Sequence, residues 1–556
     1  MKFLLLVAVF LFSSSLFAAD FPYEKSLPFS RPALEKESVE KLRLLAIQSG
    51  GRVKPFDTFA SENFQLFTGK SSFHGKDSVE LSLSMVFEPQ EWNEIPFLQM
   101  SYQELKKDLG LDTNQIFFSP KELMHSARLM PLFSELQAKQ KAQEKLNPYF
   151  QALQRLGSQL SLINELVTGK ALRFIPASPE QYQKSDAWKS LDSISDEMKL
   201  RFTLIAASFV NADPKIHERL PTHIENFQEL VKKQNSALYP AHSALAREVH
   251  FNHLHPFRLA WIFAILACIV LSFALANVAP WIYGTGMGLF FVSFCTQIYG
   301  FILRCWIAGR PPVSNMYESV LWVAFGCMLF GFILELIYRK RIIAIGSLIF
   351  CTIALIIADN VTGTLDAGIH PLEPVLRSNF WLTIHVLTIT LGYAAFALSL
   401  VLGNLGVGQY VVLGRESKVM PLKSVAVFAY RAVQVGVVLL AAGTILGGVW
   451  ADYSWGRFWG WDPKETWALI ALLGYLALLH ARFRGMVKHF GFLAGCVFFF
   501  LGVLMAWYGV NFVLGVGLHS YGFSSGGVSV MATFSSVQLA FVGYAIYLYK
   551  RAEKTK

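Results

Sequence analysis

The feature that most constrains the fold of this chain is a series of long apolar stretches that begins at Phe257 and continues toward the C-terminus. Each stretch has roughly 17 to 25 residues, the length that crosses a hydrocarbon core about 30 Å thick. About nine such spans are expected, at 257–279, 285–304, 316–337, 342–358, 380–412, 424–449, 465–481, 489–510 and 530–549. Residues 257–556 therefore predict an all-α, polytopic helical membrane domain.

The preceding part of the chain differs in composition. Residues 20–256 are rich in Glu, Lys, Gln and Ser, and they carry helical periodicity over 134–167 and a helix-start signal at Ser119–Leu123. Residues 1–19 have one lysine, a short apolar run and small residues near their end, which is typical of a secretory signal peptide or signal anchor. We therefore expect a mainly helical extracytoplasmic domain at 20–256.

Basic residues indicate how the spans are oriented. In the membrane domain they gather after the third, fifth and seventh spans and in the C-terminal tail, at Arg339, Lys340, Arg341, Arg415, Lys418, Lys423, Arg482, Arg484, Lys488, Lys550, Arg551, Lys554 and Lys556. The opposite loops hold only Arg310, Arg377, Arg457 and Lys464. Because basic loops stay in the cytoplasm, residues 20–256 and the loop 450–467 are expected on the outer side of the membrane. This topology explains the formal net charge of +10 without a nucleic-acid partner.

The cysteines do not indicate a disulfide framework. All six lie within or at the edge of expected spans: Cys268, Cys295, Cys305, Cys327, Cys351 and Cys496. None lies in the expected extracytoplasmic domain, and small buried apolar side chains are the better interpretation. The sequence has no Cys-x-x-Cys-His segment, so the chain is not itself a c-type cytochrome.

The stretch WGRFWGWDPKETW at 455–467 places four tryptophans close together, at Trp455, Trp459, Trp461 and Trp467. Tryptophan favours the membrane interface, so an aromatic belt is one interpretation. The other is a platform for a flat apolar ligand with a polar rim, because Gly456 and Gly460, which lie among the tryptophans, let a ligand approach the backbone closely. Asp462, Pro463 and Glu465 are typical of the cap and first turn of the next helix.

Two histidines narrow the choice of ligand. His385 lies near the outer end of the span 380–412, and His519 follows the span 489–510 on the same side. Each histidine alone is compatible with ordinary packing. Together with the tryptophans, they form the parts of a bis-histidine haem site, which needs two axial nitrogens and a stacking surface.

These segments resemble a known family. WGRFWGWDPKETW is similar to the tryptophan-rich WWD signature of haem-handling membrane proteins, and WLTIHV and GVGLHSYGF are similar to segments of the System II cytochrome c synthases, the CcsA or ResC family. RPPVSNMYESVLW at 310–322 also resembles that family, and the resemblance covers about residues 285–549. It implies that haem b is presented outside the membrane and that its vinyl groups are joined to the cysteine thiols of an apocytochrome c Cys-x-x-Cys-His segment.

The resemblance also implies roles for individual residues. His385 and His519 are expected to bind the haem iron from opposite faces, with ferrous haem as the reactive form, and catalysis would consist mainly of positioning two thiols against two vinyl groups. The expected catalytic residues are His385, His519, Trp459, Trp461 and Asp462. The residues expected to contact haem are Trp455, Gly456, Arg457, Trp459, Trp461, Asp462, Pro463, Lys464, Glu465 and Trp467. Lys464, Arg457 and Arg377 are candidates for pairing with the haem propionates.

His480 lies near the opposite end of its span from the site of His385 and His519. It lies fifteen residues after Glu465, about 22 Å along a helix, and therefore cannot bind the same iron. The resemblance implies that His480 is one member of an inner pair of haem ligands. The histidines of the N-terminal half, including His250, His253 and His255, lie in the expected extracytoplasmic domain or at the outer edge of the first span. Either a ResB- or CcsB-like subunit supplies the second ligand or the inner site is ligated differently, and the subunit is the favoured interpretation. Thiol-reducing proteins are expected as further partners.

Two alternatives stay open. The first is a haem transporter or loader of the WWD superfamily that lacks ligase activity. The second, from a different class, is a b-type electron carrier or a solute transporter in which the tryptophans are structural. A b-type bundle usually stacks histidine pairs within its helices, whereas His385 and His519 lie at the outer ends of spans. The chemistry of residues 20–256, including Gly50–Glu62, does not reveal their role.

Overall fold

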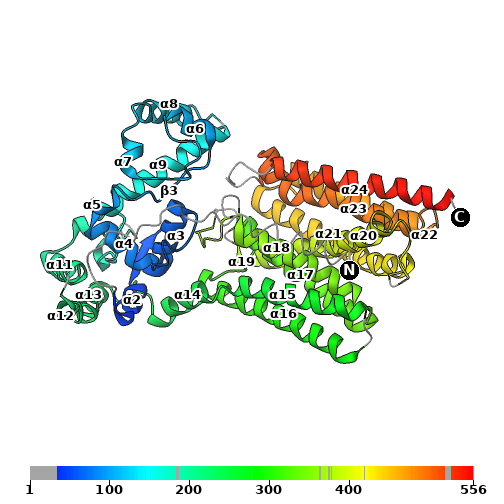
Figure 1. Cartoon of the computed structure of the whole chain (residues 1–556), viewed down its shortest axis with the longest axis horizontal. Coiled ribbons are helices and arrows are strands. Elements are labelled where there is room, and N and C mark those ends of the chain that lie inside the picture. Colours follow the sequence, from blue (N-terminus) through cyan, green and yellow to red (C-terminus); the bar gives the residue numbers. More distant parts are fainter. Residues whose placement is uncertain are drawn as a thin grey trace. The chain divides into compact units, whose positions relative to one another are not determined.

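The computed structural model describes residues 34–144, 146–182, 187–211, 213–276, 279–361, 365–372, 376, 378–418, 420–519 and 528–554. The expected signal segment 1–19 and Arg377 lie outside the described residues. The described part of the chain divides into two compact units, here named the N-terminal unit, which ends at His253, and the membrane unit, which begins at Leu254. Figure 1 labels many of the elements of both units.

The N-terminal unit is mainly helical, as the sequence predicts. Two short antiparallel pairs join β1 (Ala46–Ser49) to β2 (Arg52–Pro55) and β3 (Leu98–Gln99) to β4 (Phe117–Phe118). The α-helices are α2 (Lys36–Arg43), α3 (Phe56–Thr68), α4 (Ser78–Phe87), α5 (Pro89–Trp92), α6 (Gln103–Asp108), α7 (Pro120–Met124), α8 (Leu129–Lys141), α9 (Pro148–Val167), α10 (Pro179–Tyr182), α11 (Asp196–Val210), α12 (Pro214–His217), α13 (Leu220–Gln234) and α14 (His242–Leu254).

Local signals in the sequence start several of these helices. The expected start at Ser119–Leu123 is confirmed, because Ser119 and Glu122 exchange the two hydrogen bonds of a capping box at the beginning of α7. The periodic stretch 134–167 forms most of α8 and all of α9. The two helices are separate because Asn147 caps α9 and Pro148 occupies its first position.

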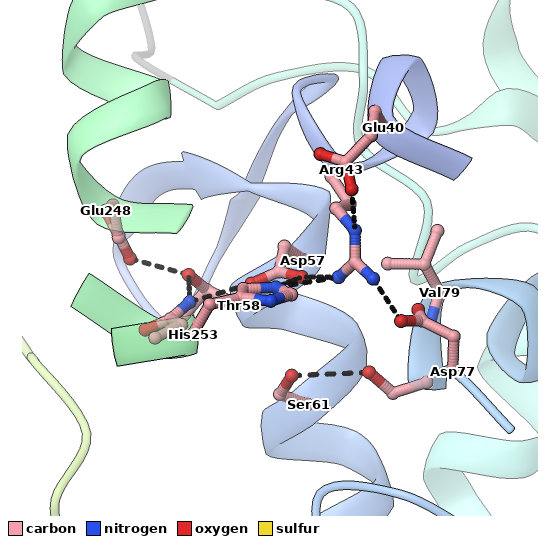
Figure 2. Close-up of polar contacts among 11 residues, drawn as sticks. Glu40, Arg43, Asp57, Thr58, Ser61, Asp77, Val79, Glu248 and His253 are labelled. Atoms are coloured by element: carbon pink, nitrogen blue, oxygen red, sulfur yellow. Dashed lines mark hydrogen bonds and ion pairs between the residues drawn. The ribbon is translucent and has the colours of Figure 1, made fainter. Parts of the chain in front are cut away.

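A network of charges connects the segment Gly50–Glu62 with α14 (Figure 2). Arg43 on α2 forms an ion pair with the buried carboxylate of Asp57 at the start of α3. Asp57 also accepts a hydrogen bond from Asn252 at 2.9 Å and lies 3.1 Å from Nε2 of His253. Although burial raises the pKa of Asp57, hydrogen bonds with His253 and Asn252 and the charge of Arg43 lower it below its ordinary value. The segment therefore contributes to the internal packing of the N-terminal unit.

The membrane unit contains nine helices, among the described residues, that are long and apolar enough to cross a membrane. This confirms the number of spans expected from the sequence, and the chain is a multi-pass α-helical membrane protein. The elements are α15 (Pro256–Ala276), α16 (Pro280–Ala308), α17 (Met316–Tyr338), α18 (Ile342–Asn360), α19 (Asn379–Trp381), the π-helical turn η4 (Leu382–Val386), α20 (Leu387–Leu413), α21 (Leu422–Trp455), α22 (Pro463–Phe483), α23 (His489–Leu504), the π-helix η5 (Met505–Leu514) and α24 (Val528–Lys554).

The tryptophan-rich connection is shorter than the loop 450–467 expected from the sequence. Helix α21 continues to Trp455 and ends where Gly456 takes a left-handed conformation with φ of +69°, which glycine adopts without a Cβ penalty. Helix α22 begins at Pro463. The non-helical connection is therefore 456–462, and the rest of the expected loop consists of the adjoining turns of α21 and α22.

Helices α20 and α21 pack with their backbones close together. A Cβ added to Gly392 would lie 3.0 Å from the backbone nitrogen of Leu440, and one added to Gly443 would lie 2.8 Å from the Cα of Ile389. Small residues allow helices in a membrane to approach in this way. The close packing brings the beginning of the fifth span against the end of α21.

Candidate functional site

One pocket of the membrane unit brings together most of the segments that the sequence singles out. Its walls come from the beginning of α17, from η4 and α20, from α21, from the beginning of α22, from η5 and from the segment after η5. Its empty volume, including the open mouth, is about 1060 Å³, at the upper end of the range of small-molecule sites. A second pocket of about 250 Å³ shares His385, Gly447, Trp450 and His519 with the first.

His385 lies in the π-helical turn η4. Its Nδ1 is 2.8 Å from the carbonyl oxygen of Gly443, and because a carbonyl only accepts, Nδ1 donates the hydrogen. The lone pair of the neutral ring is then on Nε2, the arrangement in which histidine binds a metal. The Trp450 ring lies against the imidazole, with 5.7 Å between centroids. A Cβ at Gly447 would lie 2.6 Å from the imidazole Cε1, so only glycine leaves room for this ring.

His519 reaches the same two pockets from the segment after η5. Its Nδ1 is 2.8 Å from Oδ1 of Asp462, the residue that caps α22. The carboxylate accepts, so Nδ1 donates and the lone pair is on Nε2, as in His385. Trp455 packs edge-on against the imidazole, with 5.2 Å between ring centroids.

Asp462 connects the start of α22 to the His519 segment. It forms the expected capping box with Glu465, and its Oδ1 accepts from the backbone N–H of Lys464 at 3.0 Å. Its Oδ2 accepts from the N–H of Leu518 at 2.6 Å. Although burial raises the pKa of Asp462, the hydrogen bonds from His519, Lys464 and Leu518 lower it to about 2. The carboxylate is therefore charged at neutral pH and holds His519 through a charge-assisted hydrogen bond.

The four tryptophans of the motif have different surroundings. Trp459 lines the larger pocket and Trp455 the smaller one. Trp461 is 69% exposed, with a left-handed backbone conformation at φ of +56°. Trp467 is partly buried against the apolar core of the helix bundle. Among the described residues, neither Trp461 nor Trp467 lines the two pockets.

The remaining residues of the motif divide between the pocket and the loop. Lys464 and Glu465 line the larger pocket. Glu465 also accepts from the backbone N–H of Gly460 at 2.8 Å. The guanidinium of Arg457 lies where a Cβ of Gly460 would stand. Gly456 ends α21 and Pro463 begins α22, and in the described residues these two and Arg457 are not part of the pocket lining.

His480 lies away from this site, as its separation from Glu465 predicts. It is exposed near the C-terminal end of α22, and its Nδ1 is 2.7 Å from the carbonyl oxygen of Leu476 one turn earlier. Of the described residues, it is not among those that line either pocket. Any role for His480 in holding haem therefore concerns a second place in the protein.

Several residues at the pocket lie outside the tryptophan motif, and the sequence does not single them out. Gly447 lines both pockets, and Gly443, whose carbonyl oxygen holds His385, lies one turn earlier. The two form a G-x-x-x-G pattern, which in an apolar span indicates close helix packing but no particular ligand. Trp450 lines both pockets from α21. Asn511 on η5 lines the larger one, and its buried Oδ1 has no hydrogen-bond partner within the described structure. Asn511 is a single polar residue in an apolar span, and nothing in the sequence indicates that it lies at a binding pocket.

The donor set of the site suits a planar iron porphyrin. His385 and His519 both line the two adjoining pockets, and each has its lone pair on Nε2. Haem iron takes one such nitrogen from each face. Trp450, Trp459 and Trp507 in the lining supply flat apolar surface, and Lys464 supplies a cation for a carboxylate at the porphyrin edge.

The fold and this pocket define a class, the multi-pass helical membrane proteins with a two-histidine, tryptophan-lined pocket. The family model described as cytochrome C assembly protein matches residues 313–519, so the match begins and ends at residues that line the pocket. The chain is 35% identical to the cytochrome c biogenesis protein CcsA of Synechococcus sp. over 256 residues, which are 40% of this chain and 81% of that protein. It belongs to the CcsA-type cytochrome c biogenesis proteins.

A longer relative matches more of the chain. NrfI of Wolinella succinogenes is 28% identical over 503 residues, which cover 85% of this chain and 53% of NrfI. The chain thus spans about half the length of that relative. Among solved structures, cytochrome c heme lyase CcmF is similar with a TM-score of 0.36 and 16% identity, over 53% of this chain and 50% of that chain. A score this low does not show a common fold.

Proposed function

We propose that this protein presents haem b on the outer side of a bacterial inner membrane and supports covalent attachment of haem to apocytochrome c, as a lyase of the holocytochrome c synthase type. The observation that carries the proposal is the pairing of His385 and His519 at two adjoining pockets, each with its Nδ1 donating and its Nε2 lone pair left for iron. Membership of the CcsA family supports it.

Haem, as the substrate, supplies two vinyl groups to which the cysteines of a Cys-x-x-Cys-His segment add. Each addition forms one carbon–sulfur bond, and the thiol hydrogen goes to the other vinyl carbon, so no oxidant or leaving group is needed. His385 and His519 hold the plane of the substrate, while Trp459 and Lys464 contact its apolar and carboxylate edges. Their contribution is orientation, which lowers the barrier for two thiols that arrive in the right place. The ferrous state is proposed because oxidised haem promotes thiol oxidation in place of addition.

A second subunit completes the proposal. The distribution of basic residues supports an orientation with the tryptophan-rich connection outside and the end of α22, with His480, toward the cytoplasm. We assign His480 to an inner haem site whose other ligand comes from a ResB- or CcsB-like partner. Haem would then pass from the inner site to the outer pocket, and thiol-reducing proteins would keep the apocytochrome cysteines reduced.

Co-expression with an apocytochrome c tests the proposal. The full-length chain is expressed with and without a ResB-like subunit, and covalent haem is measured by haem stain after denaturation. We expect covalent product with the partner present. We also expect the purified chain to show a haem spectrum that is lost in His385→Ala and in His519→Ala but kept in His370→Ala, a change at an exposed loop histidine.

The outcomes separate the alternatives. Bound haem with no covalent product under any condition would indicate a haem transporter or loader and contradict lyase activity. A purified chain without haem, or one that keeps its haem in both histidine variants, would contradict the assignment of the site itself.

A further inference from the structure

The membrane unit contains a buried ion pair that the proposed chemistry does not use. Nε of Arg304, near the end of α16, donates to Oε1 of Glu318, in the first turn of α17, at 2.7 Å. Both side chains are only 1% exposed. Two charges buried within the spans of a membrane protein are costly, and such groups usually serve a function.

The second oxygen of Glu318 holds the segment before α17. Oε2 accepts from the backbone N–H and from the hydroxyl of Ser314, both at 2.7 Å. Asn315 caps α17 by accepting from the N–H of Glu318 at 2.8 Å. The Nδ2 of Asn315 also donates to the carbonyl oxygen of Asp366 at 3.1 Å. Glu318 thus holds the segment before α17 at Ser314, and the side chain of Asn315 holds it at the carbonyl oxygen of Asp366.

That segment is a wall of the pocket. Val313, Ser314, Asn315 and Met316 all line it, as does Ser319 one turn further along α17. They belong to the stretch 310–322, which the resemblance to the CcsA family singles out without assigning a role. The positions of these residues therefore decide the shape of the pocket on this side.

The same wall is connected to the helix that leads to His519. The indole N–H of Trp507, on η5, donates to the hydroxyl of Ser319 at 2.9 Å. Trp507 lines the pocket, and His519 follows η5 in the chain. A shift of the segment held by Glu318 would change the pocket at two of its sides.

We propose that Glu318, held in place by Arg304, is a positioning residue that sets the 313–316 wall of the haem pocket and thereby the affinity and orientation of bound haem. This inference rests on the proposed function. Glu318 itself does not touch the substrate and acts through Ser314. A merely structural role would affect folding, but it would not depend on the hydrogen bonds to Ser314.

Two double variants isolate this contact. Arg304→Met with Glu318→Gln removes both buried charges but keeps a side-chain oxygen that accepts from Ser314. Arg304→Met with Glu318→Leu removes the acceptor as well. Neither leaves an unpaired buried charge, which would be strongly destabilising. Arg258 and Asp359, paired at 2.9 and 3.0 Å elsewhere in the membrane unit, offer the matched control Arg258→Met with Asp359→Leu.

The full-length proteins are purified in detergent and titrated with haem, followed by tryptophan quenching and by the absorbance spectrum. Amide hydrogen exchange over 313–316 is measured without haem. We expect the variant with Glu318→Leu to bind haem at least tenfold more weakly, about 1.4 kcal/mol, with an altered spectrum and faster exchange. The variant with Glu318→Gln and the control pair should stay close to the unmodified protein.

Two results would overturn the inference and are distinguishable. If the Glu318→Leu double variant keeps the affinity and spectrum of the unmodified protein while His385→Ala loses haem, the wall does not depend on Glu318 and only this inference fails. If the unmodified protein binds no haem, the proposed function fails and this inference fails with it.

Discussion

Replacing Asp462 by asparagine separates the capping of α22 from the support of His519. Asparagine caps helices about as well as aspartate, so α22 is expected to begin as before. The carboxylate of Asp462 accepts hydrogen bonds from two groups of the His519 segment. An asparagine amide has only one acceptor oxygen, so its NH₂ group would face one of these two donors. These are the N–H of Leu518 at 2.6 Å and Nδ1 of His519 at 2.8 Å. Two donors then face each other, and the charge that orients His519 is lost.

The size of the effect follows from these contacts. A hydrogen bond to a charged group contributes about 1.5–3 kcal/mol. Loss of the group that orients a metal-binding histidine typically weakens metal binding about 10–100-fold, which is about 1.4–2.8 kcal/mol. We expect Asp462→Asn to weaken haem binding within this range. Because the pKa of Asp462 is lowered to about 2, the carboxylate is charged throughout the neutral range and the loss should not vary there with pH.

Haem titration of the purified full-length protein, in the ferric and the ferrous state, measures this effect. Asp452→Asn is the matched control, since Asp452 is an exposed acidic residue near the end of α21. Suppose Asp462→Asn bound haem as tightly as the unmodified protein, with the same spectrum, while His519→Ala lost binding. His519 would then not need Asp462, and the reasoning would be refuted.

Three further results are expected. Gly447→Ala places a Cβ 2.6 Å from the imidazole in η4 and should weaken haem binding, whereas Gly288→Ala, with nothing within 4 Å, should not; equal effects would contradict the packing argument. Trp459→Leu should reduce haem retention on purification more than Trp461→Leu, because only Trp459 of the two lines the described pocket. The pKa of Asp57 is lowered, so its stabilisation is complete above the ordinary pKa of 3.8 and is lost as pH falls below it. Hydrogen exchange in α3, corrected for intrinsic rates, should therefore accelerate on acidification, and unchanged protection would refute this.

Much of the fold is encoded locally and follows from the sequence. A span is recognised by the length of its apolar run, because the membrane thickness is a property of the solvent. The capping boxes at Ser119 and at Asp462 are likewise local, since each joins residues three positions apart. The family resemblance, carried by His385, His519 and the tryptophan motif between them, indicated that the ligand is haem.

The arrangement of the site is encoded in contacts between distant segments. The hydrogen bonds of His385 to Gly443 and of His519 to Asp462 connect residues 58 and 57 positions apart. The sequence marks Asp462 as a helix cap, but no local pattern shows that the same carboxylate orients a histidine. Such a pairing depends on how the helices pack.

The sequence by itself determined the number of spans, the helical class of both units and the residue types that could hold haem. Only the tertiary structure decided that Trp459 lines the larger pocket while Trp461 is exposed and Trp467 packs in the bundle. The physical reason is that hydrophobic length and helix caps act within one segment, whereas a binding site forms where several segments pack together. Residues that are close in sequence, such as the tryptophans of this one motif, can therefore lie in different surroundings.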